Sequence, residues 1–253
     1  MCGRLMRGSN LGSIVRLQAL KSNSICYSLI VLFDESYQKP KLLGGTCGIF
    51  DNSNPYVRRA LAVLDNGIDL LRTYKDWQFF QLPNPEKYNE YDKSYIEAAN
   101  GVYTAAMTFI LLHEYAHQFC GHLDYLPSSM ESKADELSAD EYAIEKFSYN
   151  RPEDRWRTLQ YGIVSAILAL FLLSDCLSGG EDHPDIDDRL ESALKKLGLE
   201  ELDNAWGLSA LALRLWANKY DVELGPANFE KSYKEQFEEV LKEIREAKDK
   251  PTH

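Results

Sequence analysis

The chain has 253 residues, of which 45% are hydrophobic and 26% charged, and its formal net charge is −11. This composition is typical of a globular protein with one large domain or two small ones, and it excludes an intrinsically disordered chain. The negative charge argues against nucleic acid as a partner. Five widely spread cysteines, an odd number without a CxxC pair, argue against a disulfide framework and favour the reducing cytoplasm. The longest apolar run, residues 161–174, is shorter than the roughly 20 residues of a membrane span.

The front of the chain is predicted to contain a small β element. Residues 1–23 show little periodicity and are predicted to be a loosely structured segment. Residues 24–33 (SICYSLIVLF) are rich in β-branched and aromatic side chains, which favours a strand, and residues 45–50 (GTCGIF) are its expected partner. An edge strand of this element would be available to pair with a substrate peptide.

The rest of the chain is predicted to be almost entirely helical, beginning with residues 58–74. Ser94 and Glu97 fit a capping box that opens a long helix, which Gly121 ends. A second capping box, formed by Ser128 and Glu131, opens a helix to about residue 149. Further helices are expected at residues 152–177, 185–197, 200–219 and 227–247. The predicted fold is therefore mainly α, with residues 24–253 as a single domain. That domain has a core at about 93–195 and C-terminal helices at 200–247.

Residues 113–117 form an HExxH sequence, which is the main chemical signal in the chain. Because positions four apart lie on the same helix face, the imidazoles of His113 and His117 can bind one metal ion. The Glu114 carboxylate can then reach a metal-bound water as a catalytic base. We therefore predict a Zn²⁺ site with these two histidine ligands. The alternative is a buried pair of helix histidines with other partners.

A catalytic zinc needs a third protein ligand, and the next helix offers one in the sequence ExxADxxA at residues 136–143. We predict Glu136 as this ligand, with Asp140 accepting a hydrogen bond from a ligand histidine. The small residues Ala139 and Ala143 would let this helix approach the first one closely. A rival register, residues 131–135, is also ExxAD, but the capping box already explains Glu131.

The remaining candidates lie just after these motifs. Cys120 is expected to be a small buried hydrophobe, and His122 is expected to interact with the helix end. The HPDIDDR sequence at residues 183–189 is either a capped helix start or part of the site. In the second case, His183 and Arg189 would stabilise an oxyanion or brace the metal-ligand helix. Tyr142 is a further candidate oxyanion donor.

The ordered motifs HEYAH, GH, ELSADEYA and HPDIDDR together resemble those of the gluzincin metallopeptidases. The order HExxH…ExxAD…HPxxxxR is similar to that of the HtpX-type and prenyl-protease-type families and of the phage-exclusion Lit peptidases. Without membrane spans, the chain most resembles the Lit family. The resemblance implies a zincin-like helical core in which His113, His117 and Glu136 bind zinc, Glu114 is the general base and Asp140 supports the ligands. Since Lit-type enzymes cut a host translation factor during phage infection, it also implies a role in phage exclusion.

The sequence thus predicts a zinc-dependent endopeptidase that acts on a protein or peptide substrate. Two alternatives remain. One is a catalytically silent, metal-stabilised module with a regulatory or interaction role. The other is a metal-free helical interaction protein in which HEYAH arose by chance.

Overall fold

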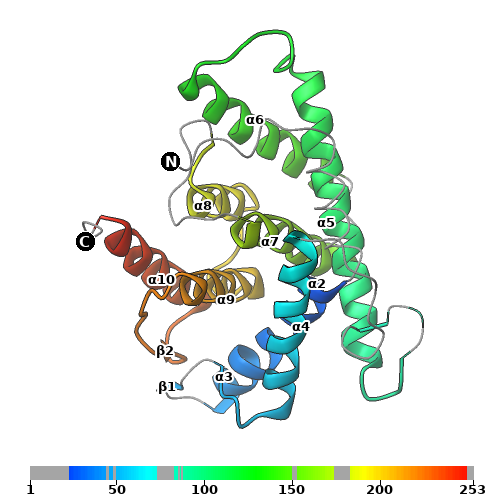
Figure 1. Ribbon diagram of the computed structural model, residues 1–253, viewed down its shortest axis with the longest axis vertical. Coiled ribbons are helices and arrows are strands. Elements are labelled where there is room, and N and C mark those ends of the chain that lie inside the picture. The colour runs from blue at the N-terminus through cyan, green and yellow to red at the C-terminus, as the bar shows by residue number, and fades with distance from the viewer. Residues whose placement is uncertain are drawn as a thin grey trace.

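The computed structural model describes residues 23–43, 46–47, 50–72, 83–84, 86, 88–149, 153–173 and 183–249 (Figure 1). These residues are mainly helical, as predicted. The elements in chain order are α2 (Ser24–Phe33), a π-helical turn η1 (Asp34–Gln38), α3 (Lys39–Leu43), β1 (Thr46–Cys47), α4 (Pro55–Arg72), α5 (Lys93–Phe119), α6 (Ser129–Ser148), a 3₁₀ turn η2 (Glu153–Arg155), α7 (Trp156–Leu173), α8 (Ile186–Lys196), α9 (Asn204–Lys219), β2 (Ala227–Asn228) and α10 (Tyr233–Lys248). None of the helices in the described ranges has the length and apolar character that a bilayer crossing requires.

The predicted N-terminal β element is wrong. Residues 24–33 form the helix α2, and nine of its ten residues are buried. A short, continuously apolar segment fits a buried helix as well as a buried strand, and here packing against α4 and α5 overrides the β propensity. Within residues 45–50, β1 pairs antiparallel with β2 from the C-terminal part of the chain. The expected substrate-pairing edge strand is therefore absent from residues 24–33. Residues 1–22 lie outside the described residues.

The sequence predicted the end of the long helix α5 correctly but not its start. Its first residue is Lys93, so Ser94 lies inside the helix and the predicted capping box is wrong. Asp92 occupies the N-cap instead, and its carboxylate pairs with Arg59 at 3.0 Å. The predicted end at Gly121 is confirmed, because this glycine has the positive φ of 77° that favours glycine at a helix end.

The following helix, α6, begins as the sequence predicted. The side chain of Ser128 accepts from the Glu131 amide, and the Glu131 carboxylate accepts from the Ser128 amide. This capping box fixes the start of α6 after the short turn that follows α5. It therefore fixes which residues of α6 come opposite α5.

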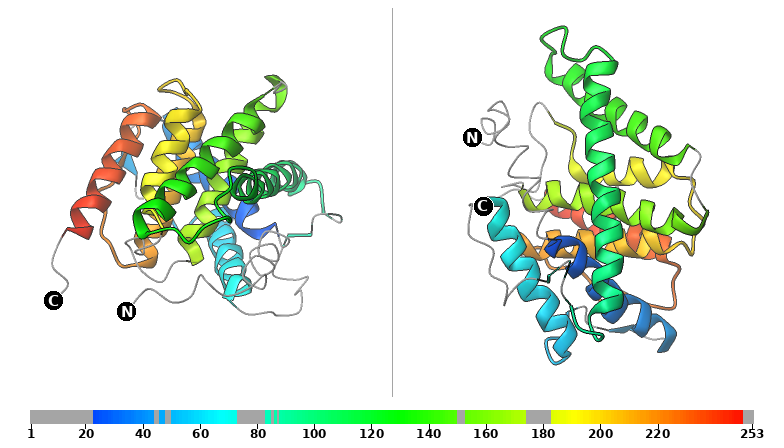
Figure 2. Two further views of the ribbon diagram at one scale, coloured as in Figure 1. Left: turned by 90° about the horizontal axis from the view of Figure 1, so that it is seen from above. Right: turned by 90° about the vertical axis from the view of Figure 1, so that its right-hand side faces the viewer.

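The packing of four helices positions the candidate site. In Figure 1, α5 runs along one side of the molecule, and α6 folds back from its end and lies above α8 and α7. The contacts of α5 with α6 and α7, and of α8 with α6 and α7, join these helices into one unit. Residues 160–169 of α7 are all buried, as expected for a core helix. Figure 2 shows the same arrangement from two further sides, with the α5–α6 hairpin projecting at one end.

Candidate metal centre

The site lies where α5 and α6 face each other, and small residues make their close approach possible. Ala116 of α5 and Ala139 and Ala143 of α6 are fully buried. An alanine side chain keeps two helix backbones closer than a larger residue would. The close approach brings the two HExxH histidines opposite Glu136.

Three side chains present donor atoms to one point. The Nε2 atoms of His113 and His117 are 3.1 Å apart. Glu136 Oε2 lies 3.5 Å from His113 Nε2, and Glu136 Oε1 lies 3.7 Å from His117 Nε2. Within the described residues, these three form a group whose ligand atoms all lie within 4.8 Å of one another. Two donors bound to one tetrahedral zinc at about 2.0–2.1 Å are themselves about 3.3 Å apart, so these donor atoms fit such an ion.

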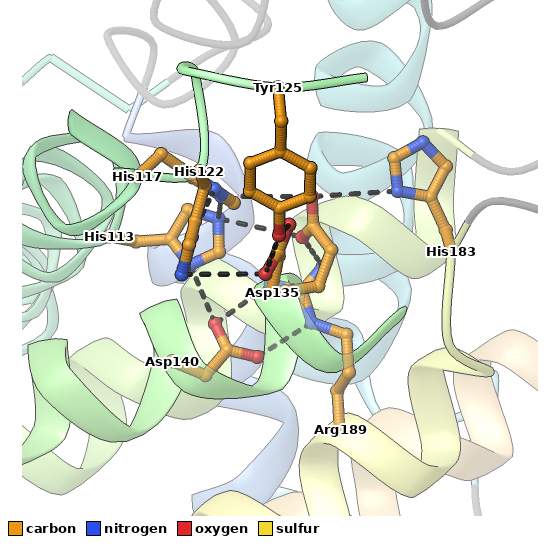
Figure 3. Close-up of polar contacts among 9 residues, drawn as sticks. His113, His117, His122, Tyr125, Asp135, Asp140, His183 and Arg189 are labelled. Carbon is orange, nitrogen blue, oxygen red and sulfur yellow. Dashed lines mark hydrogen bonds and ion pairs between the residues drawn. The ribbon is translucent and has the colours of Figure 1, made fainter. Parts of the chain in front are cut away.

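The other ring nitrogen of His113 faces an acidic residue, Asp140. His113 Nδ1 lies 2.8 Å from Asp140 Oδ1, and both side chains are nearly inaccessible to solvent. A carboxylate at this distance favours the tautomer with the ring proton on Nδ1, in which the Nε2 lone pair is free to bind a metal. Asp140 is held in turn by Arg189, whose Nε lies 2.7 Å from Asp140 Oδ2. Figure 3 shows this line of contacts from α5 through α6 to α8.

Arg189 and His183 also approach Glu136, so the HPDIDDR segment belongs to the site. Arg189 Nη1 lies 3.0 Å from Glu136 Oε2, and His183 Nδ1 lies 3.6 Å from Glu136 Oε1. Burial by itself raises the pKa of Glu136, but His183, Arg189 and the two HExxH histidines lower this pKa to about 2. Glu136 is therefore an anion at neutral pH, which is the form that binds a cation.

The electrostatics of the HExxH segment are consistent with its proposed chemistry. Burial and the neighbouring His113 lower the pKa of His117, which keeps this imidazole neutral and able to bind a metal. Glu114 is exposed, and its charge acts in the opposite direction on the pKa of His117 and raises the pKa of Arg189. The negative charge of Glu114 therefore contributes to the electrostatic environment of both side chains.

A second line of polar contacts leads away from His117, and sequence reasoning missed it. His122 Nδ1 lies 3.1 Å from His117 Nδ1, and His122 Nε2 lies 3.5 Å from Asp135 Oδ1. The Tyr125 hydroxyl donates to Asp135, with distances of 2.9 and 2.7 Å to the two carboxylate oxygens (Figure 3). The available signal was the GH pair directly after the HExxH helix, together with the acid that ends the rival ExxAD sequence.

Three other candidates lie away from the metal-ligand atoms or differ from expectation. Glu131, the glutamate of the rival register, is exposed and engaged in the capping box, unlike Glu136, which faces the HExxH histidines. Cys120 is exposed, because the turn at Gly121 leaves it on the outer surface, and the prediction of a buried hydrophobe is wrong. Tyr142 packs against the rings of Tyr115 and Phe119, and it takes part in none of the polar contacts described above.

Comparison with known proteins identifies the family. The sequence profile described as Peptidase U49 matches residues 24–209, about three quarters of the chain, and this span includes every residue of the candidate metal centre. No curated protein and no solved structure shows significant similarity to the chain. The predicted resemblance is confirmed at the level of the family. The chain therefore belongs to the Peptidase U49 family, the Lit peptidase family of metallopeptidases.

Proposed function

We propose that this peptidase is a zinc-dependent endopeptidase of the HExxH gluzincin type. The observation that carries the proposal is the convergence of His113 Nε2, His117 Nε2 and a Glu136 oxygen within 4.8 Å. Two imidazoles and one carboxylate are a common ligand set for catalytic zinc, and they leave one position open for water. Membership of a peptidase family supports a protein or peptide as the substrate.

The chemistry divides between the ion and the side chains around it. A bound zinc lowers the pKa of a coordinated water and polarises the scissile carbonyl. The Glu114 carboxylate accepts a proton from the attacking water and later delivers it to the leaving amine, a contribution of about 10²–10⁴-fold. Glu114 suits this role because it is solvent-accessible and yet affects the pKa of both His117 and Arg189.

His183 is the side chain that we assign to the developing oxyanion. Its side chain is 41% exposed, and its Nδ1 lies 3.6 Å from Glu136, so the ring can also reach a bound substrate. Arg189, the other candidate, has an 8% exposed side chain held between Glu136 and Asp140. We therefore assign Arg189 to bracing α6 and His183 to hydrogen bonding with the substrate carbonyl oxygen.

The biological setting that we propose is based on the similarity to Lit peptidases. We propose that cleavage of a host protein by this chain excludes phage. Five cysteines without a CxxC pair favour a reducing compartment, and we propose the cytoplasm as the place of action. The prediction to check is that expression of the chain lowers phage plating efficiency, whereas expression of Glu114→Gln does not.

The decisive experiment combines metal analysis with mapping of new protein N-termini in one host. Wild type and Glu114→Gln should each bind about one equivalent of zinc, because Glu114 is not a ligand, but only wild type should generate new N-termini. Glu145→Gln, an exposed change on α6 away from the ligands, is the matched control and should cleave as wild type does. Less than about a tenth of an equivalent of zinc would contradict the metal centre. Zinc binding without cleavage would favour the catalytically silent module.

A further inference from the structure

The two histidines of the centre are supported in different ways. His113 Nδ1 faces the Asp140 carboxylate at 2.8 Å, which is a common support for a metal-binding histidine. His117 Nδ1 faces another imidazole nitrogen instead, that of His122 at 3.1 Å. A proton must lie between these two nitrogens, because two lone pairs at this distance repel each other.

The direction of this hydrogen bond follows from what each ring can donate. If His117 binds a metal through Nε2, its Nδ1 carries the proton and donates to His122 Nδ1. His122 then accepts with Nδ1 only if its own proton is on Nε2. That atom lies 3.5 Å from Asp135 Oδ1, and a carboxylate accepts but does not donate when ionised. With this arrangement each N–H along the line faces an acceptor, and the imidazoles of His117 and His122 both remain neutral.

Tyr125 fixes the far end of this line. Its hydroxyl donates to Asp135 at 2.7 Å, so the carboxylate is held from both sides. The side chains of His122 and Asp135 are only 10% and 15% exposed, although they come from a surface turn and the first half of α6. Low exposure of these two side chains reduces competition from water for the His117–His122 contact, whereas the Tyr125–Asp135 hydrogen bonds lie at the surface, since Tyr125 is 44% exposed.

We propose that Tyr125, Asp135 and His122 form a positioning chain that holds the ring orientation and the tautomer of His117 for metal binding. The three residues do not bind the metal or touch the substrate in this role. The proposal rests on the proposed metal centre and extends it, because it assigns each HExxH histidine its own support. Asp140 and Arg189 support His113, whereas the turn after α5 supports His117.

Two variants of His122 separate this role from its alternatives. His122→Asn keeps an acceptor oxygen near the position of Nδ1, and His122→Phe keeps the ring but removes the acceptor. The zinc dissociation constant of the full-length protein is measured by competition with a chelator. We expect His122→Phe to weaken zinc binding by about 10–100-fold, the usual effect of losing such a support, and His122→Asn to retain most of the affinity.

The other possible roles of His122 give different results. The His117 and His122 rings also pack edge to face, with centroids 5.2 Å apart. If only this packing matters, His122→Phe will retain the affinity and His122→Asn will lose it. If His122 is itself a metal ligand, both variants will lose affinity to a similar extent. Either result overturns the positioning chain.

A spectroscopic measurement checks the tautomer directly and does not depend on activity. In zinc-loaded wild type, long-range ¹H–¹⁵N spectra should show a proton on His117 Nδ1 that exchanges slowly with solvent. This signal should remain in His122→Asn and disappear in His122→Phe. Asp135→Asn and Tyr125→Phe test the outer part of the chain with small changes of shape. Each should weaken zinc binding less than His122→Phe does, and unchanged affinity in both would overturn their assignment.

Zinc binding by the wild type and by a control variant distinguishes failure of the positioning chain from failure of the metal centre. Asp124→Asn changes an exposed acid in the same turn and should leave zinc affinity unchanged. If wild type binds no zinc, the metal centre and the positioning chain both fall. If wild type binds zinc and the His122 variants match it, only the positioning chain falls.

Discussion

Arg189 binds the Asp140 carboxylate through two parallel contacts, Nε to Oδ2 at 2.7 Å and Nη2 to Oδ1 at 2.8 Å. Its third nitrogen, Nη1, lies 3.0 Å from Glu136 Oε2. One guanidinium from α8 therefore holds two carboxylates that lie one turn apart on α6. Because both acids are largely buried, their charges need this cation, and the geometry suits the fork of an arginine.

Replacing this cation should destabilise the fold. Arg189→Met leaves Asp140 and Glu136 without their shared partner, and breaking a buried ion pair in this way costs about 3–5 kcal/mol. The free energy of unfolding from urea denaturation measures the loss. Arg189→Lys should restore only part of it, since an ammonium group cannot contact both Asp140 oxygens in the same way.

The control for this change is Lys196→Met, which removes an ion pair with Glu141 between two exposed side chains. Exposed pairs contribute about 0–1 kcal/mol, so its effect should be small. Equal destabilisation by the two substitutions would contradict a bracing role for Arg189.

The two acids of α6 that fit an ExxAD register should behave differently. Glu136→Ala should strongly reduce zinc binding, because Glu136 Oε2 and Oε1 face the two ligand nitrogens at 3.5 and 3.7 Å. Glu131→Ala should leave zinc binding unchanged and lower the melting temperature only slightly, through loss of the capping box. Titration with zinc and thermal melting of both variants test the assignment. A stronger loss of zinc in Glu131→Ala would move the ligand to the earlier register.

The close contact of α5 with α7 can be tested at Gly162. A Cβ added there would overlap Ala105 Cβ and lie 2.8 Å from the Ala106 backbone nitrogen. Because backbone atoms of α5 cannot move away easily, we expect Gly162→Ala to destabilise the protein by about 1–3 kcal/mol. Gly101→Ala is the matched control on α5, since its Cβ would meet only the Thr158 methyl group, at 3.2 Å. Urea denaturation compares the two, and similar stability in both would argue against this packing.

The last helix, α10, lies beyond the residues matched by the family profile, yet it is tied to the helix that carries Arg189. Lys248 Nζ pairs with Asp187, whose side chain is 1% exposed, and lies 2.6 Å from Asp185 Oδ2. Burial raises the pKa of Asp187, and Lys248 counteracts this effect. The start of α8 therefore depends on a cation from α10.

Removing this cation should be costly. We expect Lys248→Met to lower the unfolding free energy by about 3 kcal/mol, because the buried Asp187 then loses its nearest cation. Lys242→Met, on the exposed side of α10, should have no measurable effect. Calorimetric unfolding of both variants distinguishes them, and equal melting temperatures would refute the dependence.

The helices were predictable where periodicity and caps agree. The Ser128–Glu131 capping box and the glycine at 121 fixed the turn between α5 and α6, since both act through local hydrogen bonds and backbone conformation. The strand prediction for residues 24–33 was wrong because this segment is buried on nearly all sides. Its sequence therefore lacks the alternation of polar and apolar residues that distinguishes a strand from a helix. The prediction of Ser94 as the N-cap was wrong because the helix begins earlier, at the N-cap Asp92, which pairs with the distant Arg59.

By itself, the amino-acid sequence determined the family resemblance, and it predicted the HExxH histidines and Glu136, rather than Glu131, as the metal ligands. These depend on spacing along one helix and on a local cap, both of which are encoded within a few residues. Only the tertiary structure decided that Arg189 joins Glu136 to Asp140 and that His122 faces His117. Those contacts depend on how α6 lies over α8 and on how the chain turns after α5, and such distances are set by the packing of whole helices.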